Sequence, residues 1–213
     1  MQECELVAAW SAGDRAAGQE LLRRYAGCLQ RFFRNKVTLI AEDLVQETML
    51  AILDGHERYE GRSTFRAYLL SIARHRLYDH YRKRKRDLEH MEFDTVTVAD
   101  FGPSPSVCVA KENEQRLLLE ALRQIPLNYQ IVLELCYWED MTGPEISEVI
   151  GAPLDTAYSR LRKAKALLKK KLEVLSGSRE LLQTTQDRLE LWASAVRQRT
   201  ARPLNDPDID EVS

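Results

Sequence analysis

The chain has 213 residues, of which 44% are hydrophobic and 30% are charged, and its formal net charge is -2. This size predicts one or two globular domains, and we expect two. No run of about 18 apolar residues occurs, which excludes a membrane segment on hydropathy. The N-terminal segment MQECELVAAW does not have the basic-then-apolar order of a signal peptide, so we expect a cytoplasmic protein.

The near-neutral total conceals a strong segregation of charge along the chain. Residues 62–86 contain nine Lys or Arg and a single acid, Asp79. The last residues are acidic instead, with Asp206, Asp208, Asp210 and Glu211. Such separate basic and acidic segments indicate charged partners for parts of the chain, which the net charge does not reveal.

The cysteines and histidines predict neither a metal site nor a cofactor. No CxxC pair occurs among the cysteines, which are Cys4, Cys28, Cys108 and Cys136. This pattern supports neither a zinc knuckle nor a disulfide framework. The four histidines show no ligand spacing with acids or cysteines, so we expect no enzyme.

Two amphipathic helices are predicted in the first quarter of the chain. Apolar residues recur at helical spacing after the Gly13-Asp14 break, which predicts a helix over about 15–34. The segment AEDLVQETMLAILDG predicts a second helix that ends at Gly55 and buries Leu44, Val45, Thr48 and Ile52. Its outer side carries Asp43, Gln46 and Glu47. From the residues alone, this polar side is either ordinary solvated surface or a docking face for a basic partner.

A third helix is predicted over 63–86, with basic and aromatic residues interleaved around a buried stripe. The stripe consists of Phe65, Leu69, Ile72 and Leu77. Tyr68 and His75 lie seven residues apart and project from one side, and Arg66, Arg74, Tyr78 and Arg82 are expected at other exposed positions. Aromatic rings beside cations suit unpaired bases, which stack on the rings while cations hold the backbone. The alternative is an amphipathic helix with a basic, solubilising tail.

Residues 142–165, TGPEISEVIGAPLDTAYSRLRKAK, predict a helix-turn-helix. Thr142 and Glu145 form a capping box, Pro144 fits the first turn, and Gly151 suits a helix end at positive φ. In the second helix Ala157, Leu161, Ala164 and Leu168 share an inward face. The outward residues, suited to phosphates and base edges, are Thr156, Tyr158, Ser159, Arg160, Arg162 and Lys163. A solvated basic helix of an αα-hairpin is the alternative.

The remaining segments are a linker, two scaffold helices and an extension. Residues 87–112 show no helical period and predict an extended, mobile linker. Helices are expected on either side of Pro126, below the helix-turn-helix. After the break at Ser176-Gly177-Ser178, one amphipathic helix is predicted over about 178–200, followed by the acidic tail. Its apolar stripe includes Leu181, Leu189, Trp192 and Val196. This stripe either packs on the preceding domain or regulates the protein.

Three of these segments occur in one order: DLVQETML from Asp43, STFRAYLLSIARHRLYDHYR from Ser63, and IPLNYQIVLELCYWEDMTGPEISEVIGAPLDTAYSRLRKAK from Ile125. In combination and spacing, over about residues 5–172, they resemble the bacterial sigma-70 family, specifically sigma factors of the extracytoplasmic-function (ECF) type. The resemblance implies an all-α fold. Sigma domain two would cover 1–86, the linker 87–112, sigma domain four 113–173 and the C-terminal extension 174–213.

The resemblance also implies a function and partners. The protein would be a promoter-specificity subunit that binds core RNA polymerase at the β′ clamp helices and β flap and reads the -10 and -35 promoter elements. It would catalyse no reaction and need no cofactor. An anti-sigma factor, or contact with the C-terminal extension, would regulate it. A stand-alone helix-turn-helix repressor or activator is the alternative, but it would leave the first basic helix unexplained.

Carried over residue by residue, the resemblance assigns two further sites. Asp43, Gln46 and Glu47 become polymerase contacts. The -10 element is assigned to Phe65, Tyr68, Arg74, His75 and Arg82. Tyr68 and His75 stand where Trp and Asn are common in the family, and Asp155 and Tyr158 where Gly and a cation are common, so the sequence does not define the promoter bases.

Overall fold

The computed structural model describes residues 2–37, 40–55, 59, 61, 63–84, 96–101 and 113–175, and these ranges contain only helices and loops, apart from one isolated bridge. The elements are α1 (Glu3–Ser11), α2 (Arg15–Arg34), α3 (Ala41–Asp54), α4 (Phe65–Arg84), the 3-10 helix η2 (Val98–Phe101), α6 (Asn113–Arg123), α7 (Leu127–Tyr137), α8 (Gly143–Ile150) and α9 (Leu154–Leu175). The all-α prediction is confirmed.

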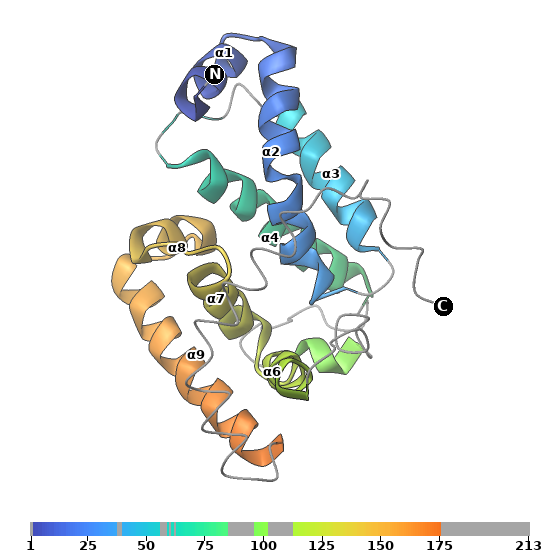
Figure 1. The fold of residues 1–213 in the computed structure, drawn as a ribbon, viewed down its shortest axis with the longest axis vertical. Helices are drawn as coiled ribbons and strands as arrows, with labels where there is room; N and C mark the ends of the chain where they lie inside the picture. The colour runs from blue at the N-terminus through green and yellow to red at the C-terminus, as the bar shows by residue number, and fades with distance from the viewer. Residues whose placement is uncertain are drawn as a thin grey trace.

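Helices α1 to α4 form a first unit whose contacts follow from the local sequence. Asp14 caps α2 by accepting hydrogen bonds from the backbone N–H groups of Ala16 and Ala17, at 2.8 and 3.3 Å. Gly18 lets α1 lie close to α2, because an added Cβ would come within 2.5 Å of the Trp10 side chain. The upper part of α2 therefore has α1 beside it in Figure 1.

The predicted faces of α3 and α4 are largely confirmed. The four expected inward residues of α3 are buried: Leu44, Val45, Thr48 and Ile52. In α4, Phe65, Leu69 and Leu77 are buried as expected. Tyr78, however, is only 5% exposed, so the prediction of an exposed Tyr78 is wrong. Its hydroxyl donates a hydrogen bond to Asn128 of the second half of the chain, a contact that helical periodicity cannot reveal.

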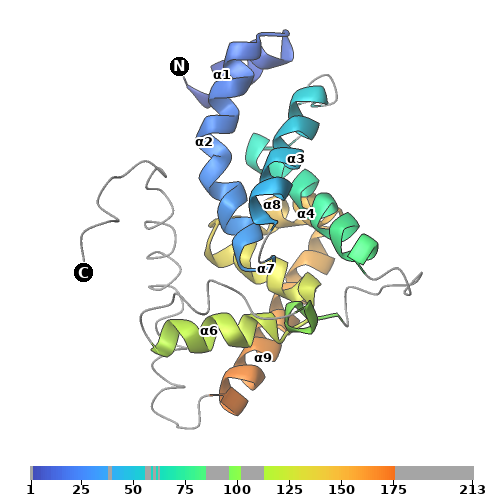
Figure 2. The same cartoon turned by 90° about the vertical axis from the view of Figure 1, so that its right-hand side faces the viewer.

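Helices α6 to α9 form a second unit in which α7 is central. Tyr129 and Leu133 of α7 pack with α6 and α9, while Ile131 and Leu135 belong to the core shared with the first unit. The residues of α7 from Leu127 to Leu135 are buried except Asn128, which is partly buried. Both views place α7 between α9 and the first unit (Figures 1 and 2).

The helix-turn-helix has the predicted caps. Thr142 and Glu145 form the capping box, with the Thr142 N–H donating to the Glu145 carboxylate at 2.8 Å. Helix α8 ends at Gly151, which has φ 61°. The Ser147 hydroxyl donates to the Ala152 carbonyl at 2.6 Å and holds the turn closed. The predicted inward residues Ala157, Ala164 and Leu168 of α9 are buried.

The predicted linker is partly ordered, which corrects the expectation of an extended segment. The backbone N–H of Leu127 donates to the Val96 carbonyl at 2.9 Å, and Thr97 forms an isolated bridge with Pro126. Val98, at the start of η2, is buried in the main core. Two valines therefore anchor this segment against the start of α7. The rest of the linker lies outside the described residues.

Gly151 offers a direct test of the predicted turn. A Cβ at this position would meet no atom within 4 Å, so Gly151→Ala introduces backbone strain without a clash. We expect it to lower the free energy of unfolding by about 1 kcal/mol, because the left-handed conformation disfavours a Cβ. Gly151→Asn should lose less, since Asn tolerates this conformation. Urea denaturation measures both, and an alanine variant as stable as the parent would contradict the assignment.

Candidate nucleic-acid interface

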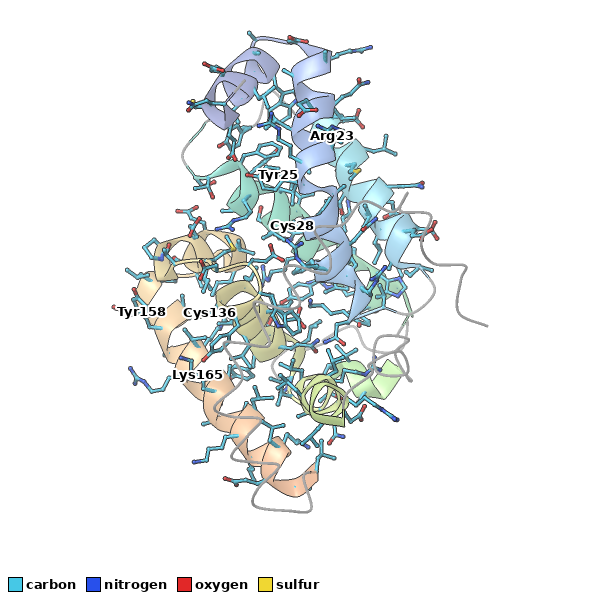
Figure 3. All side chains as sticks on the ribbon, in the orientation of Figure 1. Arg23, Tyr25, Cys28, Cys136, Tyr158 and Lys165 are labelled. Carbon is cyan, nitrogen blue, oxygen red and sulfur yellow. The ribbon has the colours of Figure 1, made fainter. Side chains whose placement is uncertain are left out.

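The predicted outward face of α9 is open to solvent. Tyr158 is 47% exposed, Ser159, Arg162 and Lys163 are exposed, and Thr156 and Arg160 are partly buried. Figure 3 shows Tyr158 at the outer edge of α9, on the side away from α2. The structure thus brings all six predicted side chains to the first three turns of one helix. The arrangement presents hydroxyls and guanidinium groups to one surface, as a helix in a major groove requires.

Tyr158 also has a structural contact that joins the two helices of the motif. An added Cβ on Gly143 would come within 2.5 Å of the Tyr158 ring, so the ring lies directly over the start of α8. Asp155 lies in the first turn of α9, where a carboxylate is favourable for the helix dipole. The two unusual residues of the recognition helix therefore both have local structural roles.

The -10 assignment of Phe65 is not supported by its position. Phe65 is 2% exposed, and its ring lies 5.4 Å from both Trp10 and Tyr25 and 5.8 Å from Tyr59. These rings form a packed aromatic core. Phe65 therefore follows the apolar stripe of α4 and offers no surface to a base, which corrects its assignment as a DNA contact.

The other predicted residues of α4 keep some exposed surface. Tyr68 is partly buried, and its hydroxyl donates to the Gly55 carbonyl at 3.3 Å. Arg74 is partly buried and its guanidinium lies over the Tyr78 ring at 4.5 Å. His75 is exposed, as is Arg82, which pairs weakly with Asp79 at 3.4 Å. These four form a discontinuous basic and aromatic surface along α4.

The outer face of α3 includes an apolar residue that the sequence analysis missed. Asp43, Gln46 and Glu47 are exposed as predicted. Leu50 is 59% exposed and follows them at helical spacing, three residues after Glu47. Leu50 thus adds an apolar side chain to an otherwise polar face. The spacing of positions 43, 46, 47 and 50 could have placed Leu50 on this face, because residues three and four apart lie on the same side of a helix.

The two units meet through polar contacts that the sequence analysis did not predict. Arg31 of α2 binds Glu139 of the α7–α8 loop with two hydrogen bonds, at 2.7 and 2.9 Å. Arg66 of α4 donates to the Glu139 carbonyl at 2.6 Å and pairs with Glu145 at 3.3 Å. Lys36 pairs with Glu134 of α7 in the interior.

The surroundings of Arg31 and Cys28 at this interface shift the pKa values of both side chains. Burial alone would lower the pKa of Arg31, but the hydrogen bond and charge of Glu139 raise it above the usual value. Burial raises the pKa of the Cys28 thiol well above its ordinary value, and the nearby charge of Glu139 adds to this effect. Arg31 therefore stays charged, and Cys28 stays a neutral thiol beneath the loop that carries Glu139.

Three further features of the sequence analysis are metal ligands, membrane-spanning helices and the apolar stripe of the C-terminal extension. Within the described residues, no three His, Cys, Asp or Glu gather where they could hold a metal ion. Among the same residues no helix is long and apolar enough to span a membrane. The extension residues Leu181, Leu189, Trp192 and Val196 lie outside the described part of the chain.

Comparisons with known proteins match both units. The model of sigma-70 region 2 matches residues 19–87, and that of sigma-70 region 4 matches residues 115–168. The RNA polymerase sigma factor CarQ of Myxococcus xanthus is 30% identical over 174 residues, or 79% of this chain and 94% of CarQ. The chain belongs to the sigma-70 family of RNA polymerase sigma factors.

Two further relatives support the subgroup and the fold. The ECF sigma factor SigX of Bacillus subtilis is 29% identical over 153 residues, covering 70% of this chain and 77% of SigX. The sigma factor RpoE of Bartonella quintana, solved in complex with the anti-sigma factor NepR, has a TM-score of 0.59 at 22% identity and covers 73% of this chain and 96% of that chain. This sigma factor is of the ECF type and acts as a promoter-specific subunit of RNA polymerase. The stand-alone repressor is therefore not retained.

The Glu145 carboxylate should make the free energy of unfolding depend on pH. Partial burial alone would raise its pKa, but hydrogen bonds from Thr142 and the charge of Arg66 hold the pKa below the ordinary 4.5. A depressed carboxyl pKa stabilises the fold above the unfolded value and loses this effect as the pH falls through the folded value. We therefore expect Glu145→Gln to lower the free energy of unfolding by about 1 kcal/mol at pH 7, because it removes the negative charge near the N-terminus of α8. The difference should shrink in denaturant titrations as the pH falls below 4.5, and an equal difference at acidic and neutral pH would contradict this assignment.

Proposed function

We propose that this sigma factor reads the -35 element with the exposed face of α9 and the -10 element with α4. The observation that carries the proposal is the side-by-side placement of Tyr158, Ser159 and Arg162 on one exposed helical face that follows a well-capped turn. Arg and Ser side chains on such a face match base edges and phosphates of the major groove. On α4 the surface consists of Tyr68, Arg74, His75 and Arg82, without Phe65.

The outer face of α3 is proposed as the polymerase-docking surface, at the β′ clamp helices. Asp43, Gln46 and Glu47 supply negative charge and hydrogen-bond acceptors, and Leu50 supplies an apolar contact beside them. This combination suits a basic partner helix, in which cations meet the carboxylates while the leucine leaves water. A β-flap contact for the second unit follows from the family.

Regulation by a protein partner or by residues 174–213 is part of the proposal. The solved relative RpoE was crystallised with an anti-sigma factor, which supports an anti-sigma partner for this chain as well. The boundaries 1–86, 87–112, 113–173 and 174–213 remain predictions. We expect this factor, like other members of its family, to have no catalytic activity. We also expect it to act in the cytoplasm, where its polymerase is.

The assignment of α9 to the -35 element predicts that replacing Arg162 lowers transcription, whereas replacing a cation farther along α9 does not. Arg162→Ala should reduce transcription from a cognate promoter about tenfold, because an arginine contact to DNA contributes on the order of 1–3 kcal/mol. Lys169→Ala is the matched control, since Lys169 is also exposed on α9 but lies two turns beyond. Run-off transcription with core polymerase measures both. Equal losses in the two variants would contradict a reading face at the start of α9.

The docking surface predicts a separate loss of polymerase binding. Glu47→Lys should weaken binding to core polymerase at least tenfold, because it places a cation against a basic partner. Leu50→Ser should weaken it less, and both variants should fold normally because the side chains are exposed. Glu173→Lys, an exposed acid on α9, makes the same charge change elsewhere. Fluorescence anisotropy with core enzyme measures the affinity, and unchanged binding by Glu47→Lys would refute the assignment.

A further inference from the structure

Helix α9 carries exposed cations along most of its length. It contains seven Lys or Arg and only two acids. Arg162, Lys165 and Lys169 follow Tyr158 at intervals of four, three and four residues, so all four side chains lie on one side of the helix, and all are exposed. We call Arg162, Lys165 and Lys169 the cation row. The positive surface therefore continues beyond the turns that contain the proposed reading face.

The cation row is not neutralised by the residues around it. Among the described residues, no carboxylate forms an ion pair with Arg162, Lys165 or Lys169, whereas two arginines of α4 have carboxylate partners. The Lys165 ammonium lies 5.3 Å from the centre of the Tyr137 ring, a contact that leaves its charge in place. Cations of one sign along a surface attract a line of negative charge.

The chain itself contains a matching line of negative charge. Residues 206–211, DPDIDE, carry four carboxylates and no cation, and they lie outside the part of the chain that the structure describes. Pro207 favours an extended backbone at Asp206. In an extended segment Asp206, Asp208 and Asp210 project from one side, about 7 Å apart. The members of the cation row are separated by about 4.5 and 6 Å along the axis of α9, so the two lines of charge match within the reach of Lys and Arg side chains.

The length of chain after α9 allows this acidic segment to return to the cation row. Helix α9 has 22 residues and is therefore about 33 Å long. The helix expected over about 178–200 would have nearly the same length, about 35 Å, and it follows the break at Ser176-Gly177-Ser178. A chain that turns back at this break brings residues 206–211 to the first turns of α9. Arg162 lies there and belongs to both the cation row and the proposed reading face.

We propose that residues 206–211 bind the cation row of α9 and compete there with DNA. The contact rests on the proposed function only for the DNA that it displaces. Because both partners belong to one chain, the effective concentration of the acidic segment is on the order of millimolar, and a weak contact is enough to occupy the row. The segment lowers the affinity for every DNA sequence alike, so only DNA that adds base contacts holds the factor firmly.

Zero-length cross-linking of the full chain tests the contact. A carbodiimide joins a carboxylate to a lysine ammonium where the two groups touch, and peptide mass mapping identifies the joined residues. We expect residues 206–211 to be joined to Lys165 or Lys169, and the product to be lost in about 1 M salt, where the screening length is about 3 Å. Joining to Lys83 of α4 instead, or no joining, would overturn the contact.

A mixture of nitrogen-15-labelled and unlabelled chains identifies the source of the acidic segment. The joined peptides should come from one chain, and therefore carry the same label. Joined peptides of mixed label would show that the segment binds a second copy, which would overturn the contact within one chain.

Binding of a random-sequence duplex of about 20 base pairs measures the competition. Asp208→Asn with Asp210→Asn should raise the affinity of the full chain for this duplex about tenfold, because each charge removed frees a cation for a phosphate. Glu20→Gln with Asp54→Asn removes two charges from the surfaces of α2 and α3 and should change the affinity less than about twofold. Fluorescence anisotropy measures both, and equal increases would overturn the competition at α9.

Transcription with core polymerase separates this competition from the proposed function. The random-sequence duplex, added as a competitor, should inhibit Asp208→Asn with Asp210→Asn several-fold more than the parent, because DNA without a promoter then holds more of the factor. Equal inhibition of the two proteins would overturn a role of the segment in DNA competition. If neither protein initiates at any promoter, the proposed function fails, while the cross-links still decide whether the acidic segment binds α9.

Discussion

The structure depends on the burial of α7 on all sides. One face of this helix fills the core with α6 and α9, and the other packs against α2 and α4. A helix that is apolar all round would hold these partners together permanently. Here Gln130 and Glu134 interrupt the second face one turn apart. The Glu134 carboxylate accepts hydrogen bonds from Gln130 itself and from Asn35 and Lys36, which follow directly after α2. One face of α7 therefore packs mainly through apolar and aromatic side chains, whereas the other also carries a buried ion pair.

This difference between the two faces connects the fold to promoter recognition. The proposed reading helices, α4 and α9, lie in different units on either side of this surface. The capping box and the left-handed Gly151 hold α8 and α9 by contacts within a few residues of the turn. The aromatic core around Phe65 does the same for α4. The surface between the two units is different, because charged groups take the place of some apolar contacts there.

The features that the sequence predicted are those whose causes are local. Asp14, Thr142 and Gly151 act within a few residues, and the stripes of α3 and α9 follow helical periodicity. The buried pair was missed because Lys36 and Glu134 are 98 residues apart, and an isolated Lys or Glu is expected at the surface. The burial of Tyr78 has the same tertiary origin. Leu50 was missed for the opposite reason, since an apolar residue on an amphipathic helix is ordinarily assigned to the core.

The contact of Tyr158 with Gly143 limits how the promoter preference of this protein can be changed. Tyr158 lies among the proposed base readers, yet its ring also lies against Gly143, where a Cβ would force the ring to move. An exchange at 158 alone would leave a gap over α8, and a side chain at 143 would displace the ring. Engineering of the recognition helix at position 158 must therefore take account of position 143 in α8, because the two residues are in contact.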